Sequence, residues 1–224
     1  MAGMMRRTLL AGAGAWFAAP IVETVAAPPS VEFQVLRNGR DIGRHRLVLR
    51  REGRDVLCEI EVELRVGLGP ITFYRYTHEN LERWRAGRFV SFASRTDDNG
   101  TTYAVRAERA ADGIAVQGAD GAFLAPADAW PTTYWYPGFL DRGAWIDTQF
   151  GRLRRARVVP AGEGVVPVAG REVTARRFRL EGDLALELWY RDGHWVGLAA
   201  TAPDGSALTY RLLSEPALAL AGLG

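Results

Sequence analysis

The feature that most restricts how this chain can fold is the alternation of apolar and charged residues between positions 56 and 68. The apolar positions are Val56, Cys58, Ile60, Val62, Leu64, Val66 and Leu68, and the charged ones between them are Glu59, Glu61, Glu63 and Arg65. Successive side chains of a β-strand point to opposite faces of the sheet, so a period of two is typical of a strand with one buried face. The pattern predicts such a strand, with Cys58 as a small core residue rather than a reactive thiol.

A turn signal just upstream predicts the partner of this strand. Residues 52–55 read Glu-Gly-Arg-Asp, and glycine at the first central position favours a type II′ hairpin turn. Pairing outward from this turn sets Arg46 opposite Glu61 on the polar face and Leu47 opposite Ile60 on the buried face. Both faces agree on one register, which supports the hairpin.

Similar turns punctuate most of the chain, often as Asn-Gly or Asp-Gly pairs. We expect strands at 31–37, 42–51, 55–68, 71–84, 89–98, 101–109, 114–118, 153–160, 172–181, 184–191, 195–202 and 207–213. The fold class is therefore all-β, an antiparallel meander forming a curved sheet or incomplete barrel. Residues 28–216 are expected to form one domain, and residues 217–224 a short apolar tail.

The irregular stretch at about 122–150 is rich in aromatic residues. These are Trp130, Tyr134, Trp135, Tyr136, Phe139 and Trp145. Proline and glycine disfavour a long helix here, so we expect a loop with at most a short helical turn across one end of the sheet. The rings could plug that end as core, the interpretation we favour, or form a lid over a ligand. The predicted ligand-binding residues are Trp130, Trp135 and Tyr136, with Trp84 and Trp189 nearby.

A second constellation lies on one face of the expected strand at 71–84. Its members are Tyr74, Tyr76, His78, Asn80, Glu82 and Trp84. The neighbouring turns predict Arg95 opposite His78 and Asp97 opposite Tyr76. This face is either a solvated outer surface, the interpretation that one-sided sheets favour, or the polar wall of a cavity. If it is concave, His78, Glu82 and Asp97 are candidate catalytic residues of a hydrolase.

The amino terminus predicts export. Arg6 and Arg7 precede a short apolar stretch, and small residues lie near position 27, so residues 1–27 read as a cleavable signal peptide. The arginine pair is also compatible with a twin-arginine signal. The apolar stretch is shorter than the roughly 20 residues that span a bilayer, so we do not expect a membrane-spanning protein. The expected location is the periplasm or the exterior.

Composition excludes several kinds of chemistry. All 28 basic residues other than histidine are arginine, so no lysine can form a Schiff base. A single cysteine excludes an internal disulfide and a cysteine-based zinc site, and with only three histidines we do not expect a three-histidine site. We therefore expect neither metal nor cofactor. Loss of two arginines and one glutamate with the leader changes the formal charge from +2 to +1. This balance argues against nucleic acid as a partner.

A set of short segments gives the chain a resemblance to a known family. These are Asn38 to His45, Tyr74 to His78, Glu82 to Arg88, Ser94 to Gly100, Thr132 to Trp135, Asp147 to Gln149 with Gly151, and Gly182 to Tyr190. Together they resemble an uncharacterised family of exported bacterial domains of unknown function. The resemblance implies no activity and no site residues. The architecture is also similar, more distantly, to the half-barrels of periplasmic lipoprotein and lipid carriers, an analogy of fold alone.

The sequence thus favours an exported domain that binds a hydrophobic or amphipathic small molecule or lipid without catalysis. Two alternatives stay open: an envelope interaction or structural protein without a small ligand, and the hydrolase described above. The sequence leaves the oligomeric state open.

Overall fold

The computed structural model describes residues 30–68 and 71–214, and nearly all of them lie in or between β-strands. The elements are β1 (Ser30–Arg37), β2 (Arg40–Glu52), β3 (Asp55–Leu68), β4 (Ile71–Arg85), β5 (Arg88–Asp98), β6 (Thr101–Arg109), β7 (Ile114–Gly118), β8 (Gly121–Ala125), β9 (Trp130–Pro131), the 3₁₀ helix η1 (Pro137–Asp141), β10 (Ala144–Ile146), β11 (Leu153–Val168), β12 (Arg171–Gly182), β13 (Leu186–Arg191), β14 (His194–Thr201) and β15 (Ala207–Leu212). The predicted leader 1–27 and tail 217–224 lie outside the described residues.

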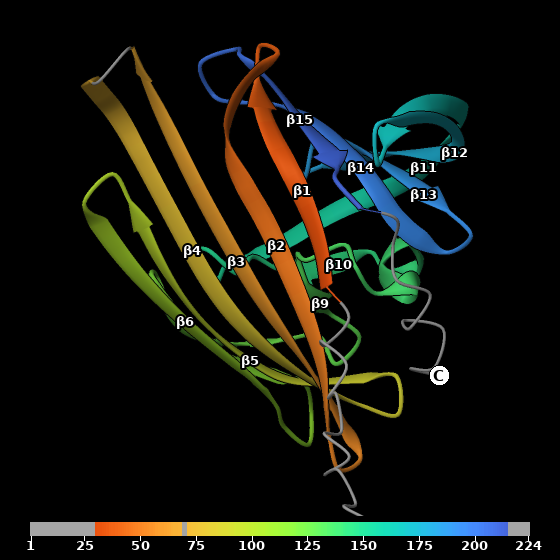
Figure 1. Cartoon of the computed structure of the whole chain (residues 1–224). Coiled ribbons are helices and arrows are strands. Elements are labelled where there is room, and N and C mark those ends of the chain that lie inside the picture. Colours follow the sequence, from red (N-terminus) through yellow and green to blue (C-terminus); the bar gives the residue numbers. More distant parts are fainter. Residues whose placement is uncertain (1–29, 69–70, 215–224) are drawn as a thin grey trace, which may run out of the picture.

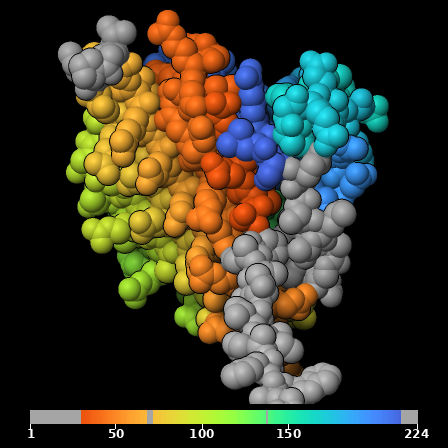
Figure 2. Space-filling view, in the orientation of Figure 1, coloured from red at the N-terminus to blue at the C-terminus, as the bar shows by residue number. Residues whose placement is uncertain are grey.

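The strands form one large sheet that curls without closing into a barrel. The order is β8-β7-β6-β5-β4-β3-β2-β1-β15-β14-β13-β12-β11-β10-β9, so the first strand pairs with the last. A single parallel pairing of Val168 with Leu212 joins β11 to β15 and bends the C-terminal strands into a partial ring. In Figure 1 the long strands β2–β6 form one curved wall and β11–β14 the other. Figure 2 shows the outer face, where β1 and β15 lie side by side.

The predicted fold class, an incomplete antiparallel barrel, is confirmed. The hairpin of β2 and β3 has the predicted register, with Arg46 opposite Glu61 and Leu47 opposite Ile60. Gly53 in its turn has a φ of +61°, as the first central position of a type II′ turn requires. Cys58 is fully buried in the core, and this burial raises the pKa of its thiol.

The core lies between the two walls, and the aromatic stretch runs through it. The short strands β9 and β10 pair in parallel, Trp145 opposite Trp130, and β10 continues the sheet from β11. Together with residues of β4, β5 and η1 they form the part of the core that we call the aromatic plug. In it Phe89, Trp130, Trp135 and Tyr136 pack around Trp84, and Phe139 packs on Trp145. The predicted short helical turn is therefore present.

Strands β8, β9 and β10 and the extension of β11 to Val168 were not predicted. β9 has two residues and β10 three, too few to show any periodicity. Within the described residues, no helix is both long and apolar enough to cross a membrane.

Candidate functional site

The inner wall of the site begins with β4, whose polar face points into the molecule. The prediction of a solvated surface is wrong, because His78, Asn80 and Glu82 are all at least 95% buried. The predicted register with β5 is also wrong: His78 lies opposite Thr96, and Asp97 lies opposite Thr77. A bulge at the start of β5, where Arg83 pairs with Ser91 and Trp84 with Phe89, shifts the pairing by one residue. A shift of one residue moves every side chain to the other face.

Glu82 fastens the aromatic plug to β4. Its fully buried carboxylate accepts hydrogen bonds from the indole N–H groups of Trp84 (2.8 Å) and Trp135 (2.9 Å) and from Asn80 Nδ2 (3.1 Å). The Thr133 hydroxyl also bonds to it. Burial raises the pKa of Glu82, and these donors oppose that rise. Four uncharged donors from two segments meet at this carboxylate, so we interpret Glu82 as a structural anchor.

His78 lies further along the same face and contacts the chain on two sides. Its Nδ1 is 2.8 Å from Thr96 Oγ1 on β5, and its Nε2 is 3.4 Å from Thr148 Oγ1 in the loop after β10. Burial lowers the pKa of His78 to about 4, although the negative charge of Asp147 raises it in part. At neutral pH the imidazole is therefore uncharged.

Beyond His78 the two walls enclose a cavity of about 320 Å³. Its lining residues are His45, Ile60, Val62, Leu64, Tyr76, His78, Thr132, Thr133, Tyr134, Asp147, Thr148, Gln149, Leu184, Leu186, Leu198, Ala200, Leu208 and Tyr210. They come from β2, β3, β4, the turn before β13, β13 itself, β14, β15 and the segments around β9 and β10. The cavity is thus part of the central space that the aromatic plug leaves unfilled. Its volume falls within the roughly 300–1,000 Å³ typical of small-molecule sites.

One buried polar side chain in this wall, His45, has no hydrogen-bond partner among the described residues. His45 is 7% exposed, and neither of its ring nitrogens makes a hydrogen bond. Burial lowers its pKa to about 3. Buried polar groups without partners are uncommon, since each costs on the order of 1–3 kcal/mol. Outside the cavity lining, the described residues show the same for Asn80 Oδ1, Trp145 Nε1 and His194 Nδ1.

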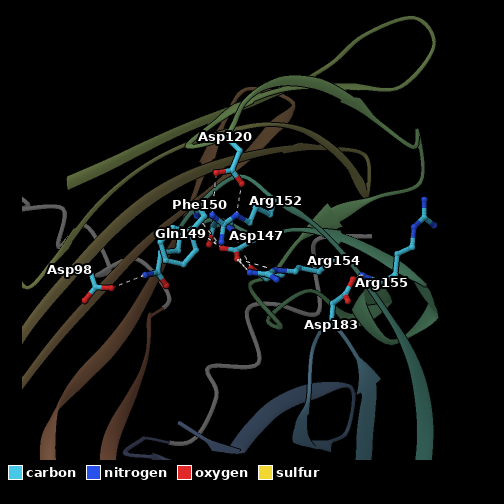
Figure 3. A network of polar contacts seen from close by, with 11 residues as sticks. Asp98, Asp120, Asp147, Gln149, Phe150, Arg152, Arg154, Arg155 and Asp183 are labelled. Carbon is cyan, nitrogen blue, oxygen red and sulfur yellow. Dashed lines mark hydrogen bonds and ion pairs between the residues drawn. The ribbon is translucent and has the colours of Figure 1, made fainter. Parts of the chain in front are cut away.

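Asp147 is the one acidic residue in the lining, and its charge is already neutralised. Its carboxylate lies 2.9 Å from Arg154 Nη2 and accepts hydrogen bonds from the backbone N–H groups of Gln149 and Phe150 (Figure 3). The same view shows Gln149 reaching toward Asp98 of β5, which ties the loop to the N-terminal wall. Asp147 therefore shapes the loop that carries Thr148 and Gln149.

Residues 33–213 match the family described as "Domain of unknown function (DUF6134)". The chain belongs to this family. No curated protein matches it. Among solved structures, it is similar to a β-barrel-like protein of domain of unknown function DUF1849 from Brucella abortus. That likeness has a TM-score of 0.58 and 10% sequence identity, and it covers 84% of this chain and 96% of the other. It supports the fold alone.

In this DUF6134 domain the predicted ligand-binding residues lie in two places. Trp130, Trp135, Tyr136 and Trp84 pack on one another in the aromatic plug, with the Trp84 and Tyr136 rings stacked at 4.5 Å. The cavity is lined instead by the adjacent residues 132–134. Trp189 alternates with two core residues of β13 and therefore lies on the other face of that strand, near Gly164 and Gly197.

The three predicted catalytic residues do not meet in the DUF6134 domain. Glu82 is enclosed by the donors of the aromatic plug, and His78 lies at the cavity wall. Asp97 is on the outer side of β5, where its carboxylate accepts a hydrogen bond from the backbone N–H of Gly100 in the turn. The bulge in β5 is the physical reason for this separation. No group of three or more potential metal-ligating residues lies within the described part of the chain.

Sequence reasoning missed the residues that line the cavity from distant elements. His45 was named only as the end of a family segment, and Tyr210 was not singled out. Tyr134 was seen only as one ring among many, and Thr148 only as part of a family segment. The available signal was the pair of polar segments, 132–133 and 147–149, that flank the aromatic residues. Their convergence with β2 and β15 depends on how the sheet curls.

Proposed function

We propose that this domain binds a small amphipathic molecule in the cavity between its two walls, without catalysing a reaction. The observation that carries the proposal is the cavity itself: a space of about 320 Å³ lined by aliphatic and aromatic side chains together with polar ones, among them the unpartnered imidazole of His45. Such a lining, mostly apolar with a few directed polar groups, is characteristic of small-molecule sites.

Size sets the scale of the proposed ligand. A water molecule occupies roughly 30 Å³ of liquid, so the space equals roughly ten waters. This fits a compact amphiphile or part of a longer chain rather than a whole phospholipid. Burial of its apolar part against Leu184, Leu186 and Leu198 would supply the main binding energy.

The geometry gives less support to a hydrolase that uses His78, Glu82 and Asp97. Asp97 faces the opposite side of the sheet, and the Glu82 carboxylate is already surrounded by four donors. A general base must reach the proton that it removes. Binding needs no such convergence.

The experiment combines native mass spectrometry with a cavity-filling variant. The protein is purified without detergent and examined for co-purifying small molecules, and binding of a fluorescent apolar probe is titrated. Ala200→Trp places a ring in the cavity wall, while Ala93→Trp places one on the exposed outer face of β5. We expect Ala200→Trp to weaken probe binding at least about tenfold and Ala93→Trp to leave it unchanged. Absence of any bound molecule and equal probe binding by both variants would contradict the proposal.

We further propose that the domain acts outside the cytoplasm. The support is the leader-like sequence of residues 1–27 with its arginine pair. Fractionation of cells that produce the full chain tests this: we expect the shortened protein in the periplasm or medium. Replacement of Arg6 and Arg7 by lysine would block export only if the twin-arginine route is used, and a full-length product in the cytoplasm of unmodified cells would refute export.

A further inference from the structure

The polar groups that face the cavity carry no net charge at neutral pH. His45 is uncharged there, because burial lowers its pKa to about 3. Burial raises the pKa of Tyr210 to about 12 and also raises those of Tyr76 and Tyr134. His78 is likewise neutral. Together these groups offer hydrogen-bond donors and acceptors without charge.

Four of these groups gather at one side of the cavity. The Tyr210 ring meets the His45 ring edge-on at 5.7 Å. Tyr134 and Tyr210 both pack near the Trp195 ring, with centroids 5.4 and 6.1 Å from it, and Tyr76 lines the same cavity. The three hydroxyls have no hydrogen-bond partner within the described chain, whereas the Tyr190 hydroxyl outside the cavity donates to the Tyr134 carbonyl at 2.6 Å. β2, β4, β15 and the segment after β9 each contribute one member.

No charged side chain in the lining is free to pair with an ionic ligand. The lining contains no arginine, and Asp147 is paired with Arg154. An anionic ligand would exchange its hydration for neutral donors and would lie near the Asp147 carboxylate. A cationic ligand would have to compete with the Arg154 guanidinium for that carboxylate. Burial of a charge without a partner costs far more than burial of a hydrogen-bonded neutral group.

We propose that the ligand of this cavity has an uncharged polar end, such as a hydroxyl, an amide or a ketone, held by His45 and Tyr210. This inference rests on the proposed function, because it assigns the chemistry of a ligand for the same cavity. Neutral imidazole supplies one donor and one acceptor, and the phenol adds a hydroxyl that can do either. The aliphatic strands opposite hold the apolar part.

The test compares eight-carbon probes that differ only in their polar end: the alcohol, the primary amide, the carboxylate and the alkylammonium. Their dissociation constants are measured at neutral pH by calorimetry. We expect the alcohol and the amide to bind at least about tenfold more tightly than either ion. Equal or tighter binding of an ion would overturn the inference while leaving the proposed function intact. If none of the four probes binds, and no other small molecule is retained, the proposed function fails instead.

A single-atom variant locates the polar end. Tyr210→Phe removes one hydroxyl with little change in volume, and we expect it to weaken the alcohol and amide several-fold while leaving the weaker binding of the two ions unchanged. Tyr103→Phe is the matched control, since Tyr103 packs on Phe150 outside the cavity. Should Tyr210→Phe disturb folding, His45→Leu, read by the same ratio of alcohol to carboxylate affinity, decides the question. An unchanged ratio in a folded variant would refute the assignment of these residues.

Discussion

The aromatic plug and the cavity occupy the same central space of one curled sheet, yet they differ in whether their buried polar groups are hydrogen-bonded. At Glu82 a buried carboxylate is met by four donors from β4 and the segment after β9. At His45 a buried imidazole meets none among the described residues. The arrangement at Glu82 needs no functional explanation, because a buried polar network whose members are all hydrogen-bonded stabilises a single structure. The second costs stability, and such costs are retained where function uses them.

The largest effect is expected from removing the anchor of the aromatic plug. Glu82→Leu leaves the indole N–H groups of Trp84 and Trp135, and the donors beside them, buried without an acceptor. We expect a loss of about 3–5 kcal/mol in the free energy of unfolding. Urea denaturation measures it. Glu79→Leu, on the exposed face of the same strand, is the control and should change stability by only about 0.5 kcal/mol. Similar losses in the two variants would mean that Glu82 does not anchor the plug.

A loss of stability in acid is expected from His78, which lies between the aromatic plug and the cavity. His78 has a pKa of about 4 when folded, below the ordinary 6.5, so the unfolded chain binds its proton more readily. The contribution of His78 to the free energy of unfolding is thus fully present above pH 6.5 and is lost as the pH falls toward 4. The loss is on the order of 3 kcal/mol. His45 acts in the same direction, whereas Glu82, with its raised pKa, acts in the opposite one.

Because His45 and Glu82 also change their charge in acid, the effect of His78 is measured as the difference between a variant and the unmodified protein. We expect His78→Gln to lose less stability than the unmodified protein between pH 6.5 and 4, as measured by denaturant titration at several pH values. Asp55 does not interfere: hydrogen bonds from Arg85 and Arg83 lower its pKa below the ordinary 3.8, so its contribution to stability disappears only in stronger acid. Parallel pH profiles of the two proteins would show that folding does not lower the pKa of His78.

A smaller effect is expected where the aromatic plug has no spare room. A Cβ at Gly138 would lie 2.6 Å from a ring carbon of Trp130, so Gly138→Ala must displace the indole. Overpacking of this kind costs about 1–3 kcal/mol. Gly143→Ala, with nothing within 4 Å of its Cβ, is the matched control near the end of η1. Thermal unfolding of the two variants should separate them, and equal melting temperatures would mean that the plug is more loosely packed than the structure indicates.

The two regions also differ in how far the sequence could predict them. Local turn chemistry predicted the register of β2 and β3, since a type II′ turn and both faces of the hairpin agree on one pairing. It failed two hairpins later, between β4 and β5, because the bulge at Val90 has no turn signal and reverses which face of β5 is buried. The proline and glycine residues correctly excluded a long helix from the aromatic stretch. The cavity could not be predicted, because His45 and Tyr210 are 165 positions apart and meet only through the pairing of β1 with β2 and β15.

The smallest expected effect has the opposite sign and separates the two regions most directly. His45→Leu replaces an imidazole whose nitrogens have no partner with an aliphatic side chain, among Phe33, Trp195 and Tyr210. Removal of an unsatisfied buried polar group should stabilise the protein by about 1 kcal/mol. The free energy of unfolding at neutral pH, without added ligand, measures this gain. If the variant is instead destabilised by more than about 1 kcal/mol, His45 has a partner in the empty protein, such as bound water, and the cavity wall is satisfied in the same way as the aromatic plug. A gain in stability together with weaker binding of neutral probes would show that His45 lowers the stability of the protein but is needed to bind the ligand.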